Sequence, residues 1–166
     1  AVIGGTIGVI AMMSGFTGVV VGLQGFAALE QLGSSVLTGF LSAYVNTREI
    51  APIVAALALS ATVGCCFTAQ LGAMRISEEI DALEVMAVPS VPFLVTTRMI
   101  AGFVAVIPLY IVGLLAAYLA SRVISTVFNG QSTGSYDHYF NLFLPPQDVL
   151  YSFAKVLVFA FVLILI

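Results

Sequence analysis

The chain of 166 residues is 61% apolar and only 8% charged, with five Lys and Arg against eight Asp and Glu. Soluble domains carry about 25% charged residues, and exposed apolar area on this scale would cause aggregation in water. The composition therefore excludes a soluble enzyme, a disordered chain and a disulfide scaffold, and it leaves an integral membrane protein. A net charge of −3 without a basic cluster also argues against a nucleic-acid partner, because phosphates are bound by many Lys and Arg.

Four predominantly apolar segments are long enough to cross a membrane. The hydrocarbon core is about 30 Å thick and needs roughly 20 helical residues, and backbone groups in lipid must bond to one another within helices. We therefore predict an all-α, polytopic helical bundle that forms a single transmembrane domain over 1–166, with spans over about 1–29, 50–74, 99–121 and 149–166. The first and last spans lie in apolar runs that reach the chain ends, so we expect the protein to continue beyond both.

Two segments between the spans are more polar. Gln31–Thr47 is uncharged but carries polar residues at helical spacing, which predicts a buried or interfacial amphipathic helix. Residues 122–148 are rich in Gly, Ser, Asn and Tyr and contain two adjacent prolines near their end. This second segment predicts a surface excursion with some short structure.

Small residues recur along the first span at alternating intervals of four and three. In lipid, small residues let helix backbones approach closely, and a repeat of 3.5 residues keeps them facing one partner. We interpret this glycine seam as a surface that packs against another helix or a second copy of the protein. The alternative is that glycine is simply common in membrane helices. The seam consists of Gly4, Gly8, Ala11, Gly15, Gly18, Gly22 and Gly25.

A short acidic helix is predicted between the second and third spans, over about 77–88. Ser77 suits an N-cap, and Glu78 and Glu79 then fall in the first turn, where the helix dipole favours negative charge. Two alternatives remain open: the helix lies on the membrane surface, or it docks on a protein that offers Arg or Lys to the acids. Its apolar face comprises Ile76, Ile80, Leu83, Met86 and Ala87, and its acidic face comprises Glu78, Asp81 and Glu84.

No catalytic, metal or nucleotide site is predicted in this chain. His138 is the only histidine, which argues against a His-rich metal site. Lys155, the only lysine, lies in no Gly-rich loop, so there is no Walker A motif. We interpret Cys65 and Cys66 as two small hydrophobic side chains. If ATP drives this protein, another chain must bind the nucleotide.

Several motifs resemble those of the MlaE/YrbE permease family, the membrane subunits of ABC transporters that work with MCE-domain proteins. The hallmark is Glu-Glu-x-Asp-Ala-Leu at 78–83, preceded by Leu-Gly-x-Met-Arg at 71–75 and followed by Glu-Val-Met-x-Val-Pro at 84–89. The segment Arg-Glu-Ile-Ala-Pro at 48–52 also matches. The continuation Val-Pro-Phe-Leu-Val-Thr-Thr-Arg at 91–98 is closer to actinobacterial YrbE proteins of Mce systems.

The resemblance implies that 77–88 is a cytoplasmic coupling helix docked on an ABC ATPase subunit, which would hold ATP and Mg²⁺. The loop 122–148 would then lie on the outer side, and the full chain would have about five transmembrane helices, four of them present here. The resemblance also implies a second permease subunit, identical or paralogous, MCE-domain partners and a place in the cytoplasmic (inner) membrane. The residues that would couple to the ATPase are Arg75, Ser77, Glu78, Glu79, Asp81, Ala82, Leu83 and Glu84.

Arg48 and Glu49 match an Arg-Glu pair that lies near the lipid cavity in this family. Charges at that depth are costly unless they are paired or in contact with water, which favours a functional role. The alternative is a pair that anchors the helix end at the interface.

We therefore predict a permease subunit that moves a hydrophobic lipid between the membrane and an MCE conduit, powered by a partner ATPase. The alternatives are an ATP-independent secondary transporter, which would show mid-span charges and internal repeats, and a non-transporting membrane scaffold.

Overall fold

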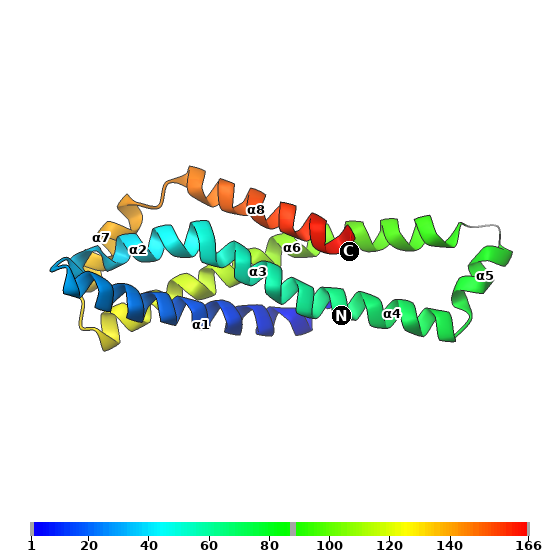
Figure 1. Ribbon diagram of the computed structural model, residues 1–166, viewed down its shortest axis with the longest axis horizontal. Helices are drawn as coiled ribbons and strands as arrows, with labels where there is room; N and C mark the ends of the chain where they lie inside the picture. Colours follow the sequence, from blue (N-terminus) through cyan, green and yellow to red (C-terminus); the bar gives the residue numbers. More distant parts are fainter. Residues whose placement is uncertain (1, 87–88, 166) are drawn as a thin grey trace.

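The protein is an elongated bundle of helices (Figure 1). The computed structural model describes residues 2–86 and 89–165 and, within them, all side chains except those of 2–4, 62–63, 82–84, 90, 91, 93, 98, 164 and 165. These described residues form helices and turns but no strand. Helices within Gly5–Gln31, Leu94–Phe128 and Pro146–Leu163 are long and apolar enough to cross a membrane, which confirms the predicted all-α polytopic membrane fold.

The first helix, α1 (Val2–Gln31), covers the predicted first span. It ends in a turn at Gly33, whose φ of 69° is a left-handed conformation that glycine adopts without a steric penalty. The N–H groups of Gly33 and Ser34 donate to the carbonyls of Glu30 and Leu29, which satisfies part of the last helical turn. A short 3₁₀ turn, η1 (Ser35–Leu37), leads into the next helix.

A single helical rod, Thr38 to Ile76, includes most of the predicted amphipathic helix over 31–47 and the predicted span over 50–74. It consists of α2 (Thr38–Val45), the π turn η2 (Asn46–Ile50), α3 (Ala51–Leu59), a second π turn η3 (Ser60–Gly64) and α4 (Cys65–Ile76). The predicted amphipathic helix over 31–47 is therefore not separate from the second span, because the chain stays helical through both π turns. Its polar positions from Thr38 onward, including Ser42 and Asn46, are buried in the bundle.

The chain returns along the bundle through α6 (Ser90–Val123), which extends beyond both ends of the predicted span 99–121 and continues into the π turn η4 (Ile124–Phe128). The predicted surface excursion contains α7 (Thr133–Leu142), and the last span is α8 (Pro146–Leu165). Tyr136 of α7 is buried, and its hydroxyl donates to Ser121 Oγ on α6 at 3.3 Å. The excursion thus packs onto the end of the bundle.

The core lies where α1, α3, α6 and α8 meet, and α1 and α6 form the most extensive helix pair. Large apolar side chains such as Met12 and Phe16 point outward instead. Because lipid tails are as apolar as these side chains, a bundle in a membrane depends on close packing and internal polar contacts. The core residues include Ile10, Ala55, Ala58, Leu109, Tyr110, Val156 and Ala160.

The structure divides the glycine seam into two parts. Gly18 and Gly22 are buried against the α6 backbone at Ala117 and Ser121, and Gly25 is buried against the Leu41 side chain of α2. In contrast, no atom lies within 4 Å of a Cβ built at Gly8 or Gly15, and Ala11 between them is half-buried. The surroundings of Gly4 are outside the described part of the structure. The second half of the seam is thus an internal packing surface, and the first half is open.

Beyond η3 the bundle becomes thinner. Most residues of α3 are buried, whereas none of the described residues of α4 is buried. The helix α4 and the first part of α6 extend past the start of α1 and the end of α8, and α5 (Glu79–Val85) connects them (Figure 1). We call α4 and α5 together the arm.

Candidate functional site

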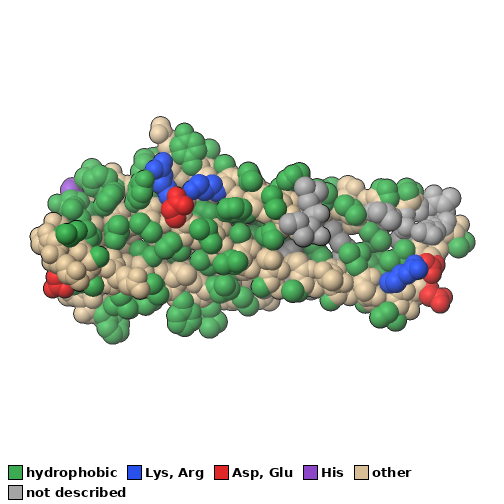
Figure 2. All heavy atoms as spheres, in the orientation of Figure 1, with side chains coloured by type: hydrophobic (Ala, Val, Ile, Leu, Met, Phe, Trp, Pro, Cys, Tyr) green, Lys and Arg blue, Asp and Glu red, His purple; other side chains and the backbone are tan. Residues whose placement is uncertain are grey.

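Charged side chains gather in two places on the face shown in Figure 2: where the rod meets α8, and at the end of the arm. The first cluster begins at η2, which carries Arg48 and Glu49. Two residues after this turn, Pro52 occupies the start of α3. Proline has no backbone N–H, and its ring crowds the carbonyl four residues earlier. A wider turn at this point lets the rod continue past the proline.

Arg48 is held from both sides. Its guanidinium donates to Tyr44 Oη at 2.8 Å and lies 5.0 Å from the centre of the Tyr44 ring. On the other side it forms an ion pair with Asp148 of α8 at 3.2 Å. The Asp148 side chain is only 13% exposed, and a carboxylate with so little contact with solvent is costly unless it is paired. Arg48 therefore neutralises a buried acid as well as facing the cavity described below.

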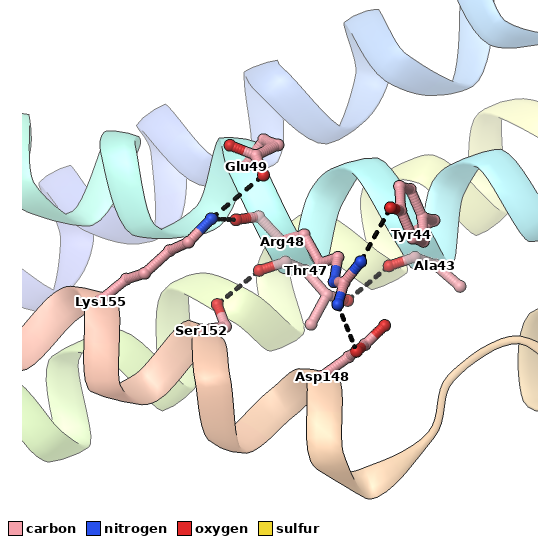
Figure 3. Close-up of polar contacts among 8 residues, drawn as sticks. All are labelled: Ala43, Tyr44, Thr47, Arg48, Glu49, Asp148, Ser152 and Lys155. Carbon is pink, nitrogen blue, oxygen red and sulfur yellow. Dashed lines mark hydrogen bonds and ion pairs between the residues drawn. The ribbon is translucent and has the colours of Figure 1, made fainter.

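Glu49 pairs with Lys155 of α8, with 3.1 Å between the Lys155 Nζ and the Glu49 Oε1. Both side chains are about half exposed, so this pair is weaker than a buried one. Arg48 and Glu49 thus point to different partners, and α8 supplies both of them (Figure 3). We call these four residues the clasp: Arg48, Glu49, Asp148 and Lys155.

The sequence motifs predict half of the clasp, Arg48 and Glu49, but not Asp148 and Lys155. A signal was present, because Asp148, Ser152 and Lys155 are spaced four and three apart and therefore share one face of α8. The sequence alone does not show which helix this polar face contacts. The structure places it against η2.

A cavity of about 650 Å³ opens beside the clasp. Arg48, Glu49 and Lys155 form its charged edge. Apolar side chains from α3 and α8 line most of the rest, including Pro52, Ile53, Tyr151, Val158 and Phe159. A concave, mainly apolar site with a few polar groups at one edge is the usual form of a small-molecule site.

A second cavity of about 770 Å³ lies further along the bundle, where α3, η3 and α4 face α6 and α8. Leu59, Phe67, Met99, Val106 and Leu163 are among its lining residues. None of its lining side chains that the structure describes is charged. The clasp therefore distinguishes the first cavity as the candidate site for a ligand with a polar group.

The second charged cluster lies at the end of the arm, and here the predicted helix start is wrong. The acidic helix begins at Glu79, so neither Ser77 nor Glu78 is in its first turn. Ser77 instead caps the C-terminal end of α4, where its hydroxyl donates to the Ala73 carbonyl at 3.0 Å. Glu78 has a φ of 60°, which breaks the helix between α4 and α5. The predicted N-cap is thus the C-cap of the preceding helix.

The end of the arm exposes both acids and apolar groups. Asp81 accepts a hydrogen bond from Arg75 Nη1 at 2.6 Å, while Glu78 and Glu79 are exposed. Ile76 and Val85 are 86% and 88% exposed, and Met86 is also exposed. Because α5 covers only Glu79–Val85, the predicted apolar face extends beyond the helix. The side chains of Ala82, Leu83 and Glu84 and all of Ala87 lie outside the described residues.

The fold and the two clusters define a multi-pass helical membrane protein, with a cavity that has charged residues in its lining and an acidic connection at one end. A comparison with protein families matches residues 1–166 to the family described as Permease MlaE. The chain belongs to the MlaE permease family.

Individual relatives agree with this assignment. The intermembrane phospholipid transport system permease protein MlaE of Haemophilus influenzae is 30% identical over 153 residues, which cover 91% of this chain and 59% of the relative. A probable ABC transporter permease protein of Rickettsia felis is 30% identical over 162 residues, covering 95% and 61%. The chloroplastic protein TRIGALACTOSYLDIACYLGLYCEROL 1 of Arabidopsis thaliana is 27% identical over 154 residues, covering 93% and 44%. The chain thus spans at most 61% of the length of these three relatives.

Proposed function

We propose that this chain belongs to the permease subunit of an ATP-driven lipid transporter of the cytoplasmic (inner) membrane. The observation that carries this proposal is the cavity beside the clasp, with charged groups at one edge and an apolar lining elsewhere. The Haemophilus influenzae relative is named as part of an intermembrane phospholipid transport system. That name supports the same class of substrate for this chain.

The cavity suits an amphiphile better than a wholly polar ligand. Its volume lies within the range of about 300–1,000 Å³ that is typical of ligand sites. Ile53, Val158 and Phe159 offer apolar contacts to an acyl chain, while the Arg48 and Lys155 cations can receive a headgroup. An acyl chain that leaves the bilayer for this lining exchanges one apolar environment for another, so selectivity rests with the headgroup contacts.

The end of the arm is proposed to dock on a separate ATPase subunit that binds ATP and Mg²⁺. Exposed acids at Glu78, Glu79 and Asp81 would face basic side chains of that subunit. Ile76 and Val85 would enter a groove, since apolar side chains this exposed at a water-facing end are typical of a protein interface. The arm then connects the site of ATP hydrolysis to the rod that carries Arg48 and Glu49.

A second permease subunit, identical or paralogous, is proposed to pack on the open half of the glycine seam around Gly8 and Gly15. At these positions another helix can approach the backbone of α1 closely.

The end of the bundle formed by η1, η4 and α7 lies opposite the arm (Figure 1). MCE-domain partners are proposed to meet the transporter at this end and to receive or deliver the lipid.

The cavity can be tested by filling it. When the full-length permease with Ile53→Trp is purified from membranes, mass spectrometry should find at least about tenfold less bound lipid than in the wild type. The reason is that the indole fills part of the cavity. Leu57→Trp is the matched control, since Leu57 is exposed one turn further along α3 and lines neither cavity. Equal lipid retention in the two variants would refute the assignment of this cavity to lipid.

A further inference from the structure

The backbone of η2 lacks two of its regular hydrogen bonds. In an α-helix, the carbonyl of residue 48 accepts the N–H of residue 52, but here residue 52 is proline and has no N–H. The carbonyl of Thr47 would accept the N–H of Ala51, yet that N–H donates to Asn46 instead, five residues back. The carbonyls of Thr47 and Arg48 therefore need donors from outside the rod, since unsatisfied backbone groups are costly in a low-dielectric interior.

Both donors come from one face of α8. Ser152 Oγ donates to the Thr47 carbonyl, and Lys155 Nζ donates to the Arg48 carbonyl at 2.8 Å (Figure 3). Since the single Ser152 hydroxyl proton is used in this way, the 2.5 Å contact with Tyr110 must be donated by the Tyr110 hydroxyl. Tyr110 and Ser152 are almost fully buried. The serine is thus fixed between α6 and the π turn.

We infer that Ser152 and Lys155 are positioning residues that complete the backbone of η2 and so hold Arg48 and Glu49 at the edge of the cavity. Lys155 has a double role, because the same ammonium group donates to the Arg48 carbonyl and to the Glu49 carboxylate. A cavity occupant with an anionic group that recruits Lys155 removes a backbone donor from the turn. Occupancy of the cavity is thereby linked to the conformation of the rod that leads to the arm.

The link to lipid rests on the proposed function, but the backbone claim does not, and the two can be tested apart. Hydrogen exchange of the amides at 50–55 is measured by mass spectrometry on the full-length permease in phosphatidylcholine nanodiscs, without ATP or partners. Lys155→Met should accelerate this exchange at least about tenfold, because a backbone hydrogen bond to a charged donor is lost. Glu49→Gln removes only the charge of the ion pair and should change exchange less than about twofold.

Pro52→Ala provides the decisive control. It restores an N–H at position 52, so the rod can return to α-helical bonding, in which the backbone N–H groups of positions 51 and 52 supply the donors for the Thr47 and Arg48 carbonyls. In a Pro52→Ala background, Lys155→Met should therefore change exchange less than about twofold. A merely structural role for Lys155, through packing or its ion pair, would leave the tenfold effect in place, and that outcome would overturn the proposal.

Ser152→Ala gives an independent measurement without any change in charge. It should also accelerate exchange in the turn, and Ser152→Thr, which keeps the hydroxyl, should restore the original rate. Wild-type exchange rates in Ser152→Ala and Lys155→Met would refute the positioning role. Adding an anionic phospholipid to the nanodiscs of the wild-type protein should also accelerate exchange at 50–55, because its headgroup recruits Lys155. If it does not, while the variant results hold, the proposed lipid function is refuted and the positioning role stands.

Discussion

Gly18 of α1 lies against the backbone carbonyl of Ala117 on α6 so closely that no side chain fits between the two helices. This contact lies within the most extensive helix pair of the bundle. It gives one half of the glycine seam a defined structural role, which the open positions Gly8 and Gly15 do not share.

The first prediction separates the two halves of the seam. Gly18→Ala should destabilise the permease by about 1–3 kcal/mol, because the new methyl group forces α1 and α6 apart. Gly15→Ala should leave stability within about 0.5 kcal/mol, since a Cβ there meets no atom within 4 Å. Thermal unfolding of the two purified variants in detergent measures the difference. Equal losses would show that the seam has a single function along its whole length.

The larger Gly15→Leu change addresses assembly. In the proposed transporter it should reduce recovery of the second permease subunit, because the leucine prevents the backbones from approaching. The variant should still unfold at the wild-type temperature as a single chain. Size-exclusion chromatography with light scattering gives the stoichiometry, and a normal complex would remove Gly15 from the proposed interface.

Charge reversal at the arm tests docking of the ATPase. Glu78→Lys with Asp81→Lys should weaken recovery of the ATPase subunit at least about tenfold, because each reversed charge opposes a basic partner. The bundle core should remain intact, since neither position is buried. Glu30→Lys reverses an exposed acid at the far end of α1 and serves as the matched control. Co-purification of the ATPase with the double variant at wild-type yield would contradict the model.

The two ion pairs of the clasp should differ in their effect on stability. Asp148→Asn should cost about 1–3 kcal/mol, because it leaves the Arg48 guanidinium without its buried counter-charge. Glu49→Gln should cost no more than about 1 kcal/mol, since both members of its pair are partly exposed. Glu49→Gln should nevertheless reduce lipid retention while the ATPase stays bound, because Lys155 loses the carboxylate that holds its ammonium group in the lining of the cavity. Thermal unfolding and lipid mass spectrometry on the same samples separate these effects.

A pH dependence is expected from the ion pair that fastens α7 to α6. Arg122 donates two hydrogen bonds to the Asp137 carboxylate, at 2.8 and 2.7 Å, and holds the pKa of Asp137 below its usual range. A lowered pKa in the folded state means that the contribution is present above the unfolded pKa and is lost as pH falls through the folded value. The unfolding temperatures of the wild type and Asp137→Asn should therefore differ at neutral pH and converge at acidic pH. A constant difference across this range would contradict the assignment.

Much of the fold followed from the sequence, because apolar length is a strong signal in membranes. The runs of apolar residues placed α1, α6 and α8, and the acidic motif at 78–83 placed the connection at the end of the arm. The helix boundaries were less accurate. Ser77 fits an N-cap by residue type, but its hydroxyl bonds to the Ala73 carbonyl because the backbone has not yet left α4. Residue type alone does not determine which of two adjacent helix ends a serine serves.

The candidate site was only half predictable for a different reason. Arg48 and Glu49 were visible as charges at the edge of an apolar segment, whereas their partners are about a hundred residues away in sequence. The pairing depends on how α8 packs against η2, and no local pattern contains that information. Pro52 did carry a local signal, since a proline inside a helical segment leaves a carbonyl without a donor. Only the three-dimensional arrangement identifies Lys155 as the group that replaces it.

Burial changes abruptly at η3, from the mostly buried α3 to the exposed α4. The helix α4 is therefore a lever that is fixed in the bundle at η3 and free at its other end. Its twelve residues extend for about 18 Å, so a rotation of about 10° at η3 would displace the far end by about 3 Å. Conversely, a force applied at α5 acts on η3 over the whole length of α4. Few packed side chains oppose this rotation, because none of the described residues of α4 is buried. A small rotation at η3 and a larger displacement of α5 therefore describe the same motion.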